Sequence, residues 1–167
     1  MKPDHVHRRL ALLAYCLICA ASASSAQVVP ADRDELEKGA SAGSALVAEM
    51  YGFPGPRQAL DLSDSLRMGP GQVRAIAEIY EEQRALAATK GELIILKEGA
   101  LEDLFEGGRP DDAEVRKLSA EIGRLRGELR AIHLIAHRKT KEVLTEQQVA
   151  RYKAIREAAR LRTSGTK

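Results

Sequence analysis

Two histidines stand four residues apart in the segment HLIAH, at His133 and His137. This spacing places both imidazoles on one face of a helix, which is how helices often present two ligands to one metal ion. If this helix pairs with the preceding one, Glu78 and Glu81 are the carboxylates that could add oxygen ligands. Zinc or copper would suit such a set. The heptad position of the pair also fits two histidines on a solvated helix face, so the metal site is one of two interpretations.

Few other residues are placed to carry chemistry. The only cysteines, Cys16 and Cys19, both lie in an apolar stretch near the N-terminus. No Gly-rich phosphate loop follows a strand pattern, and no further set of histidines and carboxylates stands out. We therefore expect no enzymatic activity, and no cofactor other than zinc or copper at the histidine pair.

Residues 1–26 have the pattern of a secretory signal peptide. Basic residues at 7–9 precede an apolar run at 10–20, and small residues lead up to Ala26. The apolar run is shorter than the roughly 20 residues that a membrane-spanning helix needs. We expect cleavage near Ala26, export of the remaining chain, and no membrane span afterwards. Both cysteines leave with the leader, so the exported chain has no disulfide and no thiolate metal site.

Charge does not favour a nucleic-acid partner. The whole chain has 26 Lys and Arg against 24 Asp and Glu. The predicted leader holds three of the basic residues and one of the acidic ones, so the remainder carries 23 of each. The chain also has no Trp and only two Phe, whereas single-strand binders stack bases on aromatic side chains. We expect no nucleic-acid binding.

The rest of the chain is expected to be all-α. Residues 27–66 are rich in Gly, Ser and Pro, which predicts a weakly ordered arm with at most a short helix, followed by a turn-rich linker. Residues 67–162 predict a helical domain, and residues 163–167 a disordered tail. Within the domain, long helices are expected at about 70–106 and 112–143, with a shorter one at about 146–161.

The two long helices should form an antiparallel hairpin. Gly107, Gly108 and Pro110 end the first, and Asp111 is placed to cap the second. From Val115 onward, apolar residues recur at alternating steps of three and four, as expected for a helix packed along another. A turn this short permits only antiparallel packing. The broad apolar face of the first helix needs further cover, which predicts that the last helix folds back over the hairpin and that the protein is a homodimer.

The chain contains two matching helix starts. In LTEQQ, Thr145 and Gln148 form a capping box after Leu144. In MGPGQ, Gly69 takes the place of the threonine and Gln72 that of the glutamine. Glycine is a tolerated N-cap, and proline suits the first helical position.

Two such starts around a long helical hairpin, after a signal peptide, resemble the LTxxQ-motif family of periplasmic proteins. This family includes the Spy and CpxP types and the zinc-linked ZraP and CnrX types. The resemblance covers about residues 62–160; the second motif matches fully, and the first departs from it at Gly69. It implies a four-helix, cradle-shaped homodimer that holds unfolded proteins without ATP or takes part in the envelope-stress response. The alternative that it admits is a periplasmic heavy-metal sensor or resistance protein, and a periplasmic sensor domain could be a partner.

A client-binding surface needs exposed apolar residues among charges. The segment LIILKEGALEDLF is apolar on more than one face, although a dimer partner could cover it. We expect contacts with clients or with the dimer partner at six residues of the hairpin: Ile94, Leu101, Leu104, Phe105, Arg126 and Arg130.

Overall fold

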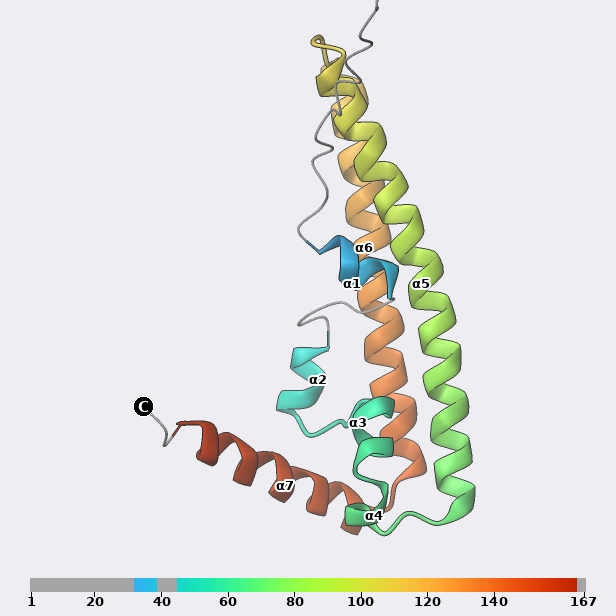
Figure 1. The fold of residues 1–167 in the computed structure, drawn as a ribbon, viewed down its shortest axis with the longest axis vertical. Coiled ribbons are helices and arrows are strands. Elements are labelled where there is room, and N and C mark those ends of the chain that lie inside the picture. The colour runs from blue at the N-terminus through green and yellow to red at the C-terminus, as the bar shows by residue number, and fades with distance from the viewer. Residues whose placement is uncertain (1–31, 39–44, 165–167) are drawn as a thin grey trace, which may run out of the picture.

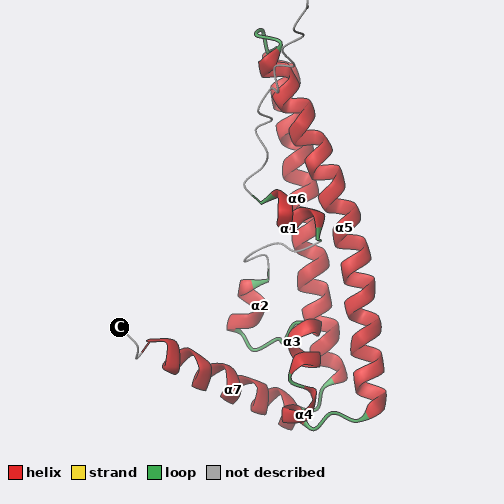
Figure 2. Cartoon of the chain, in the orientation of Figure 1, coloured by secondary structure: helices red, strands yellow, loops and turns green. Residues whose placement is uncertain are grey.

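The computed structural model describes residues 32–38 and 45–164 of the chain, so the predicted signal peptide lies outside the described residues. The described residues form helices and no strand (Figure 2). Within them are seven helices: α1 (Arg33–Glu37), α2 (Leu46–Met50), α3 (Pro56–Asp61), α4 (Ser63–Leu66), α5 (Pro70–Glu106), α6 (Asp112–Val143) and α7 (Glu146–Ser164). The all-α class is confirmed. None of these helices combines the length and the apolar composition that crossing a bilayer requires.

Helices α5 and α6 lie side by side along their length (Figure 1). The turn between them contains Gly108, whose φ of +76° is one that glycine adopts without strain. The carboxylate of Asp111 then accepts the backbone N–H of Glu114 at 3.3 Å and caps α6. Ile94 of α5 and Leu125 of α6 are both buried in the seam. The long helix pair therefore matches the sequence prediction.

Ion pairs cross between the two long helices. Two pairs join an acidic residue of α5 to a basic residue of α6, Glu82 with Lys139 at 2.7 Å and Glu98 with Arg126 at 2.9 Å. Two others have the opposite polarity: Lys90–Glu128 at 2.6 Å and Lys97–Glu121 at 2.7 Å. All eight side chains are partly exposed, so each pair contributes only about 0.2–1 kcal/mol.

The segment before α5 is more ordered than expected. The linker prediction is wrong for residues 56–66, which form α3 and α4 and bury Ala59 and Leu66. Pro56 occupies the first position of α3, where its fixed φ and missing N–H are favourable. The glycines and prolines that indicated a linker therefore start a helix. Leu36 of α1 is also buried against the hairpin.

Helix α7 does not fold back over the hairpin. It leaves the base of the α5–α6 pair and points away from it (Figure 1). Val149 and Tyr152 in its first turns are buried, whereas most later side chains up to residue 162 are exposed. The prediction that this helix covers the seam is wrong, and α1 and α3 contact α5 instead. Residues 163 and 164 belong to α7 rather than to the predicted tail, and residues 165–167 lie outside the described residues.

Candidate functional site

Three helices begin with the same hydrogen bond. In each, the backbone N–H of the N-cap residue donates to the side-chain oxygen of a glutamine three residues later. The pairs are Gly55 with Gln58 at 3.1 Å, Gly69 with Gln72 at 3.1 Å, and Thr145 with Gln148 at 2.9 Å. Sequence reasoning found the second and third copies and missed the first. The signal was the repeated pattern Gly-Pro-x-Gln at residues 55–58 and 69–72.

The glutamines of the two predicted motifs bind each other. Gln72 Nε2 donates to Gln148 Oε1 at 2.8 Å, and Gln148 Nε2 donates to Gln72 Oε1 at 3.0 Å. Each amide also donates to the carbonyl just before the other motif: Gln72 to Val143 at 2.9 Å and Gln148 to Arg67 at 3.3 Å. All four amide N–H groups are thereby used. This glutamine pair joins the starts of α5 and α7, while Leu144 is buried beside them.

The hydroxyl of Thr145 accepts the backbone N–H of Gln148 at 3.3 Å. We expect Thr145→Ala to lower the free energy of unfolding by about 0.5–2 kcal/mol, because that donor loses its cap. Gly69→Thr should leave stability unchanged or raise it, since Gly69 has a φ of −73° and an added Cβ would meet nothing within 4 Å. Urea unfolding of both variants measures the difference. Equal stability of Thr145→Ala and the unchanged protein would contradict this account of the cap.

The third glutamine connects α3 to both α2 and α7. Tyr152 donates its hydroxyl to Gln58 Oε1 at 2.6 Å, and Gln58 Nε2 donates to Glu49 Oε1 at 2.8 Å. Arg156 donates to the other oxygen of Glu49 at 2.9 Å. Burial raises the pKa of Tyr152, so the phenol stays protonated and remains a donor. This chain of hydrogen bonds holds α2 at a fixed place against the first turns of α7.

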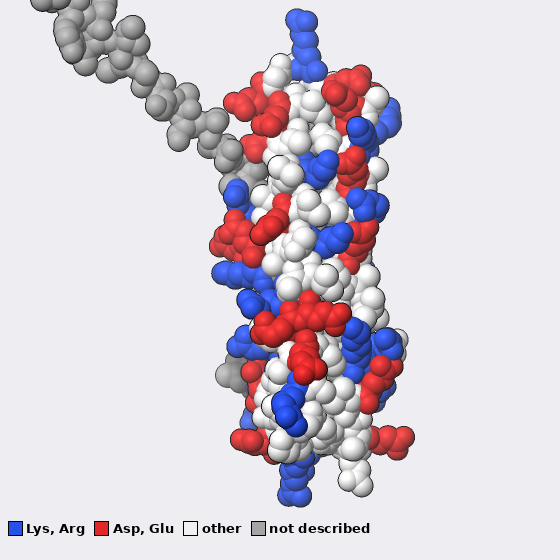
Figure 3. Space-filling view, turned by 90° about the vertical axis from the view of Figure 1, so that its right-hand side faces the viewer, with Lys and Arg blue, Asp and Glu red and all other residues white. Residues whose placement is uncertain are grey.

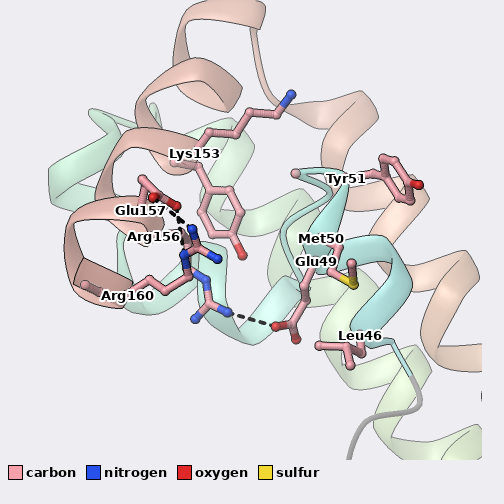
Figure 4. Close-up of a pocket in the computed structure, with 11 residues that line it drawn as sticks. Leu46, Glu49, Met50, Tyr51, Lys153, Arg156, Glu157 and Arg160 are labelled. Atoms are coloured by element: carbon pink, nitrogen blue, oxygen red, sulfur yellow. Dashed lines mark hydrogen bonds and ion pairs between the residues drawn. The ribbon is translucent and has the colours of Figure 1, made fainter. Parts of the chain in front are cut away.

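A groove of about 880 Å³ opens between α2 and α7 (Figure 4). One wall carries Leu46, Met50 and Tyr51, whose exposed fractions are 56%, 73% and 70%. The opposite wall belongs to α7 and carries mainly charged side chains, namely Lys153, Arg156, Glu157 and Arg160. Three of these four are basic. The groove therefore offers apolar contacts beside Glu49 on the α2 side and charged groups on the α7 side, where Arg156 is paired with Glu49 and Arg160 with Glu157.

The predicted contact residues lie elsewhere. Ile94 is fully buried within the chain beneath α1, so its predicted contact with a client or a dimer partner is wrong for this conformation. Leu101 and Leu104 are half-buried on the hairpin, and Phe105, near its tip, is 57% exposed. Arg130 is exposed on α6. None of these residues lines the α2–α7 groove.

Arg126 is tied to two carboxylates. It pairs with Asp32 at 2.6 Å and with Glu98 at 2.9 Å, and the hydrogen bond from Arg126 lowers the pKa of Asp32.

The sequence analysis missed the α2–α7 groove because Leu46 and Met50 lie in the stretch that was predicted to be a weakly ordered arm. Its signal in the sequence was the short apolar run LVAEMY at residues 46–51.

The histidines are buried, so the interpretation that they lie on a solvated face is wrong. His133 and His137 are 7% and 6% exposed. His137 Nδ1 lies 2.9 Å from the carbonyl oxygen of Phe53, which requires a proton on that nitrogen. Glu78 and Glu81 are exposed. Among the described residues no group of three or more His, Cys, Asp or Glu is placed to hold a metal ion, so the predicted set is not brought together.

His133 sits in a polar pocket that is only partly satisfied. Its Nδ1 lies 2.6 Å from Gln83 Nε2, so the amide donates and the ring proton sits on Nε2. That Nε2 and Gln83 Oε1 are buried without a hydrogen-bond partner among the described residues. Burial, and secondly the neighbouring His137, lower the pKa of His133. The folded protein therefore holds this ring neutral over a wider acidic range than the unfolded chain does.

This depressed pKa predicts a loss of stability in acid. As the pH falls below about 6.5, His133 binds a proton in the unfolded chain but stays neutral in the folded protein. Proton binding therefore favours the unfolded state. We expect the free energy of unfolding to decrease from pH 7.5 to pH 5.5, and His133→Gln to decrease it less steeply. Urea unfolding at both pH values measures the two slopes. Identical slopes would contradict a neutral, buried His133.

The chain matches no protein-family model, no curated protein and no solved structure.

Proposed function

We propose that the protein is an exported, periplasmic chaperone or envelope-stress protein of the LTxxQ type, which binds unfolded or partner proteins without ATP. The observation that carries the proposal is the α2–α7 groove with its exposed apolar wall. The two LTxxQ-like motifs are what supports the proposed family, and their glutamines bind each other reciprocally.

The surface of the groove suits polypeptides of varied sequence. Leu46, Met50 and Tyr51 expose apolar area next to the basic side chains of α7. Methionine is flexible and polarizable, and surfaces of this kind adapt to many partners. An unfolded segment with apolar and acidic residues would bury its apolar side chains on α2 and place a carboxylate near Lys153. Binding through shape and surface requires no covalent chemistry.

The α2–α7 groove rests on a frame of hydrogen-bonded side chains from α2, α3 and α7. Tyr152 is 1% exposed and hydrogen-bonded through Gln58 to Glu49, which fixes α2 against α7. The groove is therefore formed before any client arrives, which reduces the entropy lost on binding.

A homodimer forms part of the proposal. Leu86, Leu93 and Leu96 of α5 are 50%, 38% and 65% exposed, and Ile135 of α6 is 47% exposed. Figure 3 shows, on one face of the molecule, uncharged surface lying between charged side chains. A second copy would cover exposed apolar side chains of this kind, and neighbouring charges suit the rim of an interface. Light scattering after size exclusion gives the mass of the particle, and Leu93→Asp should shift it toward the monomer.

The proposed function is tested by measuring aggregation. The chain from residue 27 onward is mixed in stoichiometric amounts with a client that aggregates on reduction or heating, without ATP, and light scattering is followed. We expect suppression that neither zinc nor copper alters. No suppression would contradict the chaperone proposal. No suppression together with tight zinc or copper binding by calorimetry, lost in His133→Ala/His137→Ala, would instead favour a metal-binding sensor.

A further inference from the structure

Helix α1 is bound to the hairpin like a short ligand. Leu36, 1% exposed, packs among Ala87 and Ile94 of α5 and Leu125 and Leu129 of α6. Asp32, four residues earlier, lies one helical turn away on the same side, and its carboxylate pairs with Arg126 at 2.6 Å. The attachment includes one leucine in an apolar pocket and one ion pair, and Figure 1 shows α1 lying against the middle of the hairpin.

Gly91 makes this close approach possible. A Cβ added at Gly91 would lie 2.0 Å from the main-chain oxygen of Leu36, so any side chain there would exclude α1. The group that fills this space is a backbone carbonyl, which every polypeptide carries. Two contacts of the α1 docking site on α5 and α6 do depend on the occupant's side chains, namely the pocket around Leu36 and the guanidinium of Arg126.

Two properties make the occupant replaceable. Helix α1 has five residues, and a helix of that length is not stable on its own, so it persists only while docked. Its ion pair is partly open to water, since the side chains of Asp32 and Arg126 are both 38% exposed. The docking site of α1, in contrast, is built from the middle of α5 and α6, two long helices that pack against each other.

We propose that this groove is an exchangeable docking site, and that its second occupant is a helical segment of a client protein with an acidic residue four positions before a leucine. The segment competes with α1 for the pocket around Leu36 and for Arg126. Displacement of α1 exposes Ile94. The proposal rests on the proposed function only in taking clients as the source of the segment, and the site is distinct from the α2–α7 groove.

The test uses a fluorescein-labelled peptide with the sequence of residues 29–40 and the full protein, read by fluorescence anisotropy. Leu36→Ala in the protein weakens its own α1, so we expect the peptide to bind this variant about tenfold more tightly than the unchanged protein, because competition is relieved. Asp32→Asn is a milder second variant in case Leu36→Ala unfolds, and circular dichroism checks the fold of each.

Matched changes locate the peptide. Gly91→Leu in the Leu36→Ala protein should abolish binding, and a peptide carrying Leu36→Ala should bind weakly. Equal affinity for the unchanged and the weakened proteins, or binding that survives Gly91→Leu, would overturn the proposal. So would binding lost in Leu46→Asp/Met50→Asp, which would place the peptide in the α2–α7 groove, or a Leu36→Ala protein whose mass doubles, which would make a second copy the occupant. The peptide assay involves no aggregating client, so it can succeed or fail independently of the chaperone test.

Discussion

Replacing Leu46 and Met50 together by aspartate is expected to reduce the suppression of client aggregation about tenfold or more. Their side chains are 56% and 73% exposed, so the folded protein loses little packing. A bound client, however, loses apolar contacts worth about 1.5–3 kcal/mol for each side chain that it fully buries. The measurement is the concentration of protein that halves light scattering. The free energy of unfolding should change by less than about 0.5 kcal/mol.

A matched control separates the groove from the hairpin tip. Phe105 is 57% exposed at the far end of α5 and was expected from the sequence to contact clients. Phe105→Asp changes the same kind of exposed apolar residue and should leave suppression unchanged. The reverse result, with Phe105→Asp inactive and Leu46→Asp/Met50→Asp active, would move the client site to the hairpin.

The second large effect is expected at the glutamine pair. Gln148→Ala removes the acceptor of the Thr145 backbone N–H and leaves donors and acceptors around Gln72 without partners, so the free energy of unfolding should fall by about 2–4 kcal/mol. Gln72→Ala should lower the free energy of unfolding by a similar amount. Each substitution breaks the same reciprocal hydrogen bonds. The double variant should therefore lose about 1–2 kcal/mol less free energy of unfolding than the two single variants lose when added together.

Gln147 provides the control for this cycle. It stands next to Gln148 in the sequence and is exposed. Gln147→Ala should leave urea unfolding within about 0.5 kcal/mol of the unchanged protein. Strict additivity of Gln72→Ala and Gln148→Ala would show that the two motifs act as independent caps, contrary to the geometry.

Much of the fold could be predicted from local patterns. The apolar period from Val115 to Val143, the turn around Gly108 and the cap at Asp111 depend on residues close in sequence, and the structure has the corresponding helices and turn. The same is true of the helix starts at Gly69 and Thr145. Local propensity decided these features, so reading the sequence was sufficient for them.

Other features depend on contacts between distant residues. The hydrogen bonds between Gln148 and Gln72, 76 residues earlier, fix the direction in which α7 leaves the hairpin. No local sequence pattern predicts a contact between residues so far apart. The burial of His137 follows from its contact with Phe53, 84 residues away. The α2–α7 groove was missed for the same reason. The apolar residues of α2 form a wall of this groove only because Gln58 and Glu49 hold that helix beside α7.

Site-specific photo-crosslinking tests the central claim most directly. A photoreactive amino acid is placed at Met50 in one protein and at Phe105 in another, each is mixed with an aggregating client, and the samples are irradiated. The α2–α7 groove predicts a strong client crosslink from position 50 and a weak one from position 105. Crosslinking from position 105 with none from position 50 would contradict the assignment of the client site to this groove.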